Sequence, residues 1–166
     1  MTRLLRNISR TLALGLITTA CHRESNERHE QGEPHGAALS EADANSVTDA
    51  TVATWQSMDA AKIDALYAPD VVGFDVFAAP LSTDRANWTK NQQGFAAAKF
   101  DKVTLTSSKT QILDDEDFIF SSVADATSST GPMKTLTIRC TDVFRKQAAG
   151  KFLIVNEHCS LPPKGA

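Results

Sequence analysis

Hydrophobic residues follow two different spacings along this chain, and the change comes near residue 100. Before it, apolar and small residues recur every three or four positions, which is typical of one face of a helix. The first such stripe consists of Val47, Thr51, Thr54 or Trp55, and Met58. Ser40, followed by an acid three residues later, has the pattern of a helix N-cap. We therefore expect a long amphipathic helix at the start of the domain.

Two further helices are expected before residue 100. Asp59 can cap a short one, in which Ile63, Leu66 and Tyr67 share a face before Pro69 ends it. The stretch "DVVGFDVFAA" then reads as a strand. A third helix is expected after a cap at residues 82–83.

In that third helix, Trp88 and Phe95 lie two turns apart, on one face. Beyond it, four stretches have the composition of strands: "KVTLTSSKTQIL", "FIFSSVADATSS", "KTLTIRCTDVFRK" and "KFLIVNEHCS". The segments between them, "DDED", "STGPM" and "QAAG", are rich in turn-forming residues. The order predicts an α+β fold, with three helices packed on one face of a curved, mostly antiparallel sheet.

The N-terminus has the pattern of an export signal. Arg3, Arg6 and Arg10 precede the apolar run "TLALGLITTA", which is about half of what spans a bilayer. Cys21 follows small residues, as in a bacterial lipoprotein signal, so we expect it to be lipidated. Ordinary signal cleavage and an uncleaved anchor remain alternatives. The expected organisation is a signal peptide at 1–20, a polar tether at 21–38 and a domain at 39–166.

Charge narrows the choice of partners. The full chain has 17 Lys and Arg against 20 Asp and Glu, and loss of the three N-terminal arginines would leave a formal charge of −6. An acidic chain without a basic stripe argues against binding to nucleic acid. The membrane would be contacted only through the lipid. Export implies an oxidising compartment, in which disulfides persist.

Strand parity in the last two strands places four reactive side chains together. If the hairpin turns at residues 149–150, antiparallel pairing sets Cys140 opposite Cys159 and Asp142 opposite Glu157. All four then share one face with Ile138, Phe144, Leu153 and Val155, which suggests that this face is buried. The opposite face takes Arg139, Thr141, Arg145, Asn156 and His158.

This pairing permits a disulfide between Cys140 and Cys159, because directly opposed side chains lie within bonding reach. Two buried free thiols are the alternative. Asp142 beside Glu157 is the more unusual feature, because two carboxylates in an apolar site cannot both ionise cheaply. One should keep its proton unless a cation reaches it.

Two stretches resemble a known superfamily. "MDAAKIDALYAPDVVGFDV" and "CTDVFRKQAAGKFLIVNEHCS", together with the order of elements, are similar to the nuclear-transport-factor-2-like superfamily of SnoaL-like and ketosteroid-isomerase-like domains. The ending "EHCS" also resembles the association domain of the calcium/calmodulin-dependent kinase. The resemblance implies a cone-shaped fold that encloses an apolar pocket, and often a homodimer formed through the outer face of the sheet.

The resemblance also assigns roles to residues. The base of a ketosteroid isomerase falls on Asp75, and the protonated aspartic acid of its oxyanion hole falls on Asp142. The tyrosine of that oxyanion hole is replaced by Thr51, whose shorter hydroxyl cannot reach the same point. A lost donor of this kind typically costs a hundredfold or more in rate. Each acid also has a structural reading, as a loop cap or a residue that only lines the pocket.

Three functions therefore remain open. The leading prediction is a domain that binds a small, partly apolar molecule, in a pocket to which Thr51, Tyr67, Trp88 and Glu157 contribute. The second is an acid–base enzyme, an isomerase, dehydratase or hydrolase, that uses Asp75 and Asp142. The third is a dimerisation module with a vestigial pocket. No cofactor and no metal is expected in any of them.

Overall fold

The computed structural model describes residues 38–76, 81–130 and 134–162. The expected signal peptide, the lipidation site Cys21 and almost all of the tether lie outside these residues. Three helices precede or interrupt a five-stranded sheet: α1 (Glu41–Gln56), α2 (Ala60–Asp64) and α3 (Arg85–Ala97). The strands are β1 (Tyr67–Phe74), β2 (Lys102–Ile112), β3 (Asp117–Thr127), β4 (Thr135–Lys146) and β5 (Phe152–Ser160).

The helices begin where short polar side chains satisfy their first N–H groups. Ser40 and Asp43 form a reciprocal capping box on α1, and Asp59 accepts from the first turn of α2. The cap of α3 is Asp84, not residue 82 or 83 as the sequence suggested. Ser82 is unavailable for that role because its backbone pairs with Gly73, through hydrogen bonds of 2.9 and 3.1 Å.

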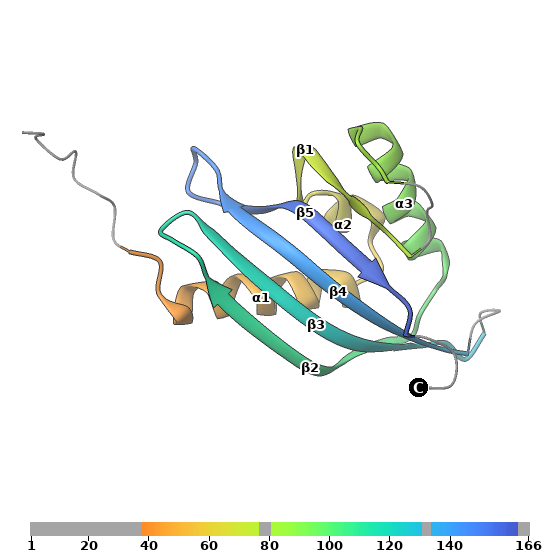
Figure 1. Ribbon diagram of the computed structural model, residues 1–166. Coiled ribbons are helices and arrows are strands. Elements are labelled where there is room, and N and C mark those ends of the chain that lie inside the picture. The colour runs from red at the N-terminus through yellow and green to blue at the C-terminus, as the bar shows by residue number, and fades with distance from the viewer. Residues whose placement is uncertain (1–37, 77–80, 131–133, 163–166) are drawn as a thin grey trace, which may run out of the picture. The chain divides into compact units, whose positions relative to one another are not determined.

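The sheet has the strand order β1-β5-β4-β3-β2 (Figure 1). β1 runs parallel to β5, and every other neighbouring pair is antiparallel. The fold class predicted from the sequence, three helices on a curved and mostly antiparallel sheet, is confirmed.

The second helix is shorter than expected. It ends at Asp64, and Tyr67 is the first residue of β1 instead of part of a helical face. Pairing with β5 accounts for the change, because Ile154 N–H donates to the carbonyl of Leu66 at 2.9 Å and Tyr67 pairs with Ile154. Pro69 therefore lies inside β1, which tolerates it as an edge strand with an irregular register.

The β4–β5 hairpin has the predicted register at one end only. Cys140 pairs with Cys159 and Asp142 with Glu157, but a bulge follows, so that Phe144 pairs with Ile154. Such a bulge adds one residue to one strand and reverses the side-chain parity beyond it. The prediction that Leu153 and Val155 face the core was therefore wrong. Ile154 is the fully buried residue there.

The core lies between the helices and one face of the sheet. Its largest fully buried side chains include Trp88, Phe118 and Phe144, the last two stacked with ring centroids 4.6 Å apart. Arg85 joins α3 to α2 through two hydrogen bonds to the Asp64 carboxylate, at 2.5 and 2.8 Å. Within the described ranges, no helix combines the length and the hydropathy needed to cross a bilayer.

Candidate functional site

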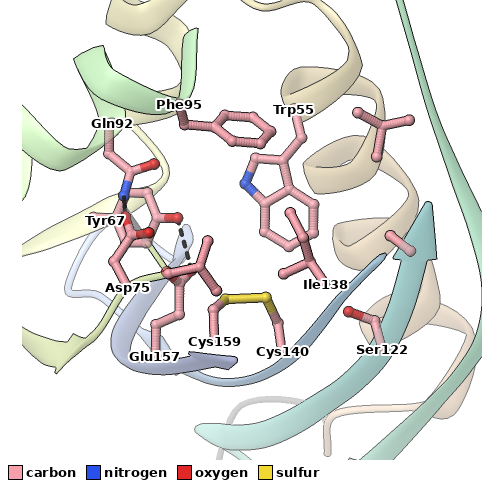
Figure 2. A pocket seen from close by; sticks show the side chains of 13 residues that line it. Trp55, Tyr67, Asp75, Gln92, Phe95, Ser122, Ile138, Cys140, Glu157 and Cys159 are labelled. Carbon is pink, nitrogen blue, oxygen red and sulfur yellow. Dashed lines mark hydrogen bonds between the residues drawn. A yellow bond between two sulfur atoms is a disulfide. The ribbon is translucent and has the colours of Figure 1, made fainter. Parts of the chain in front are cut away.

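A cavity of about 60 Å³ lies between α1, α3 and the inner face of the sheet, and part of it is open to solvent. Its lining residues come from all these elements: Trp55, Tyr67, Asp75, Val76, Gln92, Phe95, Val103, Ser122, Ala124, Ile138, Cys140, Glu157 and Cys159. Figure 2 shows Trp55 and Phe95 on the side of the cavity opposite the two cysteines. The cavity thus has mostly apolar walls, with its acidic groups gathered at one end.

That polar end is built from two hydrogen-bonded pairs (Figure 2). The hydroxyl of Tyr67 donates to Oε2 of Glu157 at 2.7 Å, and Nε2 of Gln92 donates to Oδ2 of Asp75 at 3.3 Å. Asp75 comes directly after β1, whereas Glu157 lies on the neighbouring strand β5. The parallel pairing of β1 with β5, in which Gly73 is opposite Glu157, brings the two carboxyl groups to the same end of the cavity.

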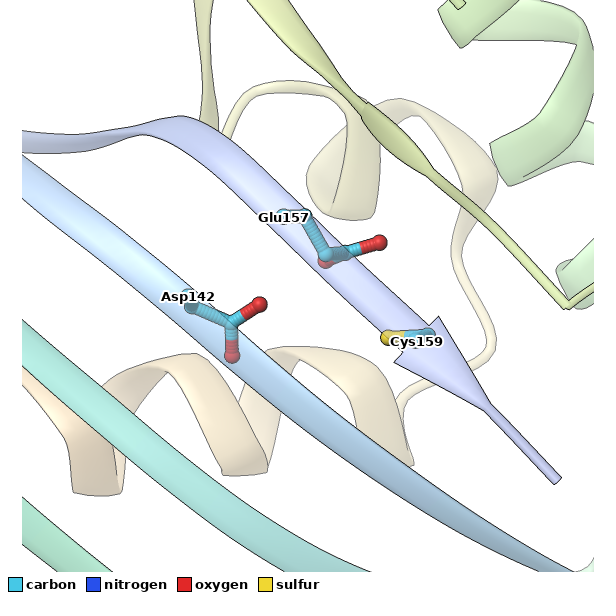
Figure 3. Close-up of side chains that lie close together, drawn as sticks. All are labelled: Asp142, Glu157 and Cys159. Carbon is cyan, nitrogen blue, oxygen red and sulfur yellow. The ribbon is translucent and has the colours of Figure 1, made fainter. Parts of the chain in front are cut away.

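Beside Glu157, on the neighbouring strand β4, lies a second carboxyl group, that of Asp142 (Figure 3). Asp142 is completely buried, and among the described residues no N–H group and no hydroxyl group donates to its carboxylate oxygens, which leaves the carboxyl group of Glu157 as its hydrogen-bonding neighbour. Burial raises the pKa of Asp142 to about 7. Burial also raises the pKa of Glu157 well above its ordinary value, and the charges of Asp142 and Asp75 add to this effect.

The two carboxyl groups therefore titrate as a pair. With both pKa values raised, the pair keeps at least one proton at neutral pH, and that proton is shared between side chains that would otherwise repel each other. The pKa of Tyr67 is raised as well, first by burial and then by the charge of Glu157, so its hydroxyl stays protonated as the donor. Tyr67, Glu157 and Asp142 thus form a buried network that borders the cavity through Tyr67 and Glu157.

The cysteines form part of the cavity floor. The structure joins Cys140 and Cys159 in a disulfide across β4 and β5, with their Cα atoms 4.1 Å apart. The Cys159 sulfur and one carboxylate oxygen each from Asp142 and Glu157 lie within 4.8 Å of one another, a spacing that suits metal ligands. A disulfide sulfur is no thiolate, however, so only two carboxylates of this cluster remain as ligands.

The predicted site residues divide into those that line the cavity, one that lies beside it, and two that belong to the core. Asp75, Tyr67, Glu157 and both cysteines of the disulfide line the cavity. Asp142, the expected proton donor, does not line the cavity and lies opposite Glu157 across β4 and β5.

Two expected pocket residues do not line the cavity, which corrects the sequence-based expectation. The Thr51 hydroxyl donates to the carbonyl of Val47, one turn back, at 3.0 Å, and this bond holds it against its own helix. Trp88 is fully buried and packs edge-on against Tyr67, with ring centroids 5.2 Å apart. Both residues support the core below the site.

Several lining residues were not predicted as part of the site. Gln92 lies on the α3 face that carries Trp88 and Phe95, so the helical spacing that identified those two could have identified it. Trp55 and Phe95 were recognised as residues of helical faces, but not as pocket walls. No local signal identifies Ser122 or Ala124, because their place depends on how the helices cover the sheet.

Comparison with known proteins identifies the family of this chain. Residues 44–164 match the model of the SnoaL-like domain, and the chain belongs to this family. No protein with a curated description matches the sequence.

Solved structures show the same fold. A domain from Xanthomonas campestris, proposed to be a calcium/calmodulin-dependent protein kinase II association domain, is 25% identical, with a TM-score of 0.64 over 78% of this chain and 94% of that one. A proposed dehydratase of the NTF2-like family from Streptomyces avermitilis is 15% identical, with a TM-score of 0.58 over 71% and 92%. A ketosteroid isomerase-like protein from Erwinia carotovora atroseptica has the same four values. These similarities establish the fold and leave the chemistry to the site.

Proposed function

We propose that this domain binds a small, partly apolar molecule in the cavity between its helices and its sheet. The observation that carries the proposal is the composition of the cavity, in which apolar and aromatic walls lead to one polar end formed by Asp75, Glu157 and Tyr67. Pockets that bind small molecules combine mostly apolar walls with a few placed polar groups. The volume of about 60 Å³ favours a ligand of few atoms, or one whose remainder lies at the mouth.

A fragment screen by thermal shift tests this proposal. We expect some small, partly apolar compounds to raise the melting temperature, because they bind only the folded state. In Ala124→Phe, a ring would fill the cavity, and the shifts should disappear. Val123→Phe places the same ring on the other face of the same strand and should preserve them. Hits that persist in Ala124→Phe, or a screen without hits, would contradict binding in this cavity.

Acid–base catalysis is the second candidate, and the position of Asp75 favours it. Asp75 as the base and Glu157 as the proton donor lie at one end of the cavity, and the charge of Asp75 contributes to the raised pKa of Glu157. Groups with perturbed pKa values in a cleft are suited to proton transfer. Turnover of a screening hit that Asp75→Asn abolishes would establish this function. Bound hits that are never transformed would leave the domain a binding protein.

Export is proposed on the pattern of the first 21 residues alone. If Cys21 carries lipid, residues 22–38 tether the domain to a membrane surface, and its ligand is met outside the cytoplasm. The intact mass of chain extracted from membranes distinguishes a lipidated Cys21 from ordinary signal cleavage.

A further inference from the structure

Two polar side chains of the cavity have hydrogen-bonding groups that the rest of the domain does not use. Ser122 on β3 and Gln92 on α3 both line the cavity. Ser122 is 7% exposed and Gln92 3% exposed, so both are almost fully buried. None of the described residues bonds to the Ser122 hydroxyl group or donates to Oε1 of Gln92. Because buried polar groups normally have a hydrogen-bond partner, these two groups indicate where a ligand bonds.

The amide group of Gln92 has a defined orientation. Its Nε2 donates to Oδ2 of Asp75 at 3.3 Å. A carboxylate only accepts hydrogen bonds, so the amide nitrogen must be the atom that faces Asp75. Oε1 of Gln92 therefore points away from Asp75 and toward the cavity (Figure 2). This oxygen accepts hydrogen bonds but cannot donate one, so its partner in a ligand must be an O–H or N–H group.

Ser122 lies at the other end of the cavity from Gln92, with the disulfide between them (Figure 2). Ser122 pairs with Cys140 on β4, and Cys140 pairs with Cys159 on β5. Neighbouring strands lie about 4.8 Å apart, so the span from β3 to β5 is about 10 Å. A ligand that bonds to both groups therefore has a polar group at each end and about five carbon atoms between them.

The surface between the two polar groups is apolar. Trp55, Phe95 and Ile138 present carbon atoms there, and the disulfide below them has no N–H or O–H group. Contact with these walls removes the apolar part of a ligand from water, which favours binding. A charged group would lose its hydration in the same place, and neither an amide nor a hydroxyl group carries a charge that offsets the loss. The site thus favours an uncharged ligand.

We propose that the ligand of this cavity is an uncharged, elongated molecule with a hydrogen-bonding group at each end, one of which donates to Oε1 of Gln92 while the other bonds to the hydroxyl group of Ser122. Its apolar middle lies over the disulfide and against Trp55 and Phe95. The inference rests on the proposed function and specifies its ligand class, of which short diols are the simplest members. No covalent bond is made or broken.

The test compares 1,5-pentanediol with 1-pentanol, which has the same carbon chain and only one hydroxyl group. Both compounds are titrated into the isotopically labelled full chain, and the shifts of amide signals report the affinity and the place of binding. We expect the side-chain amide signal of Gln92 to move with the diol, because Oε1 accepts a new hydrogen bond.

Ser122→Ala removes a hydroxyl group to which no described residue bonds, so this variant should fold as the wild type does. It should lower the diol affinity about fivefold, the loss typical of one neutral hydrogen bond. The 1-pentanol affinity should change less than about twofold, because its single hydroxyl group can still donate to Gln92. Ser121→Ala, on the opposite face of the same strand, is the matched control and should leave both affinities unchanged.

Equal effects of Ser122→Ala on the two compounds, no effect on either, or a Gln92 signal that stays in place would overturn this inference. Failure of the diol to bind, while the hits of the fragment screen disappear in Ala124→Phe, would overturn it as well, and binding in the cavity would stand. A screen without hits, together with a diol that does not bind, would overturn both proposals.

Discussion

At the scale of single residues, the acid pair Asp142 and Glu157 couples the stability of the domain to pH. A carboxyl group whose pKa is higher in the folded than in the unfolded state binds more protons when folded. Folding stability therefore falls as pH rises through the window between the two pKa values. For Asp142 this window runs from an ordinary 3.8 to about 7. The acid pair thus lowers the stability of the domain at neutral pH relative to acidic pH.

Asp142→Asn should reduce this cost. The asparagine amide is neutral at every pH and can donate to Glu157, so the free energy of unfolding should fall less between pH 4 and pH 8 than in the wild type. The raised pKa of Asp142 corresponds to about 4 kcal/mol as an upper bound, because the pair shares one proton. Urea unfolding at a series of pH values measures both slopes.

Asp115→Asn, in the exposed turn between β2 and β3, is the matched control and should preserve the wild-type slope. A slope of wild-type steepness in Asp142→Asn would show that Asp142 does not titrate in this window.

At the scale of elements, the parallel contact between β1 and β5 assembles the site, and Gly73 permits it. A Cβ atom at Gly73 would lie 2.1 Å from the backbone oxygen of Glu157, which real Cβ atoms do not approach. The two strands can lie this close only because the residue has no side chain. This close contact fixes the backbone of Glu157, and the backbone in turn places the Glu157 carboxyl group at the cavity.

Gly73→Ala should therefore push β1 away from β5 and lower the free energy of unfolding by about 1–3 kcal/mol, the usual cost of forced overpacking. Gly94→Ala, inside α3, is the matched control, because its new Cβ meets nothing within 4 Å. This change should raise the free energy of unfolding by about 0.5–1 kcal/mol, since alanine favours the helix. Urea unfolding at one pH measures the free energy of unfolding of both variants. A Gly73→Ala variant as stable as the wild type would refute the close contact.

Some strand pairings could be predicted from the sequence and other features of the elements could not, for physical reasons. The pairing of Cys140 with Cys159 and of Asp142 with Glu157 followed from strand parity, because period-two alternation leaves little freedom in a hairpin. The bulge beyond them followed from no local signal, and it reversed the expected positions of Leu153 and Val155. Tyr67 was placed in a helix because its spacing from Ile63 fits a helical face, whereas pairing with β5 prevailed over that preference.

At the scale of the whole domain, the outer face of the sheet is the expected dimer interface. Arg139, Thr141, Arg145, Asn156 and His158 are exposed there, as strand parity predicted. Phe74 is 48% exposed and packs against His158, with ring centroids 5.5 Å apart. Val143 and Ile119 pair across β4 and β3 on the same face and are half-buried. Aromatic residues and arginine are enriched in interfaces, and Phe74, Arg139 and Arg145 on this face support the proposed dimer.

A dimer should therefore appear when the molar mass in solution is measured by light scattering after size exclusion. Val143→Glu would bury a charge in that interface and should give the monomer mass. Ala53→Glu adds the same charge on the exposed side of α1 and should leave the dimer intact. A monomeric wild type would exclude this interface, and a dimeric Val143→Glu would place the contact elsewhere.

The cavity forms only when the helices pack on the sheet of the whole domain. For this reason the sequence did not identify several of its lining residues. Asp75 was identified through the resemblance to ketosteroid isomerases, and Glu157 through the strand parity of the last hairpin. Trp55, Gln92 and Phe95 became walls only through the way in which α1 and α3 cover the sheet, and Thr51 and Trp88 became core for the same reason. Helix placement depends on packing between distant segments, which no local pattern encodes.

The bulge in β5 has a consequence for anyone who wishes to re-engineer the protein. It lies between the exposed turn at residues 148–151 and the paired cysteines and acids, so the hairpin already absorbs one extra residue without disturbing them. Exposed loop tips of this kind are where insertions are best tolerated. A peptide tag or a fluorescent label grafted at Ala149 would therefore report on the domain from outside, close in sequence to the site and mechanically separated from it.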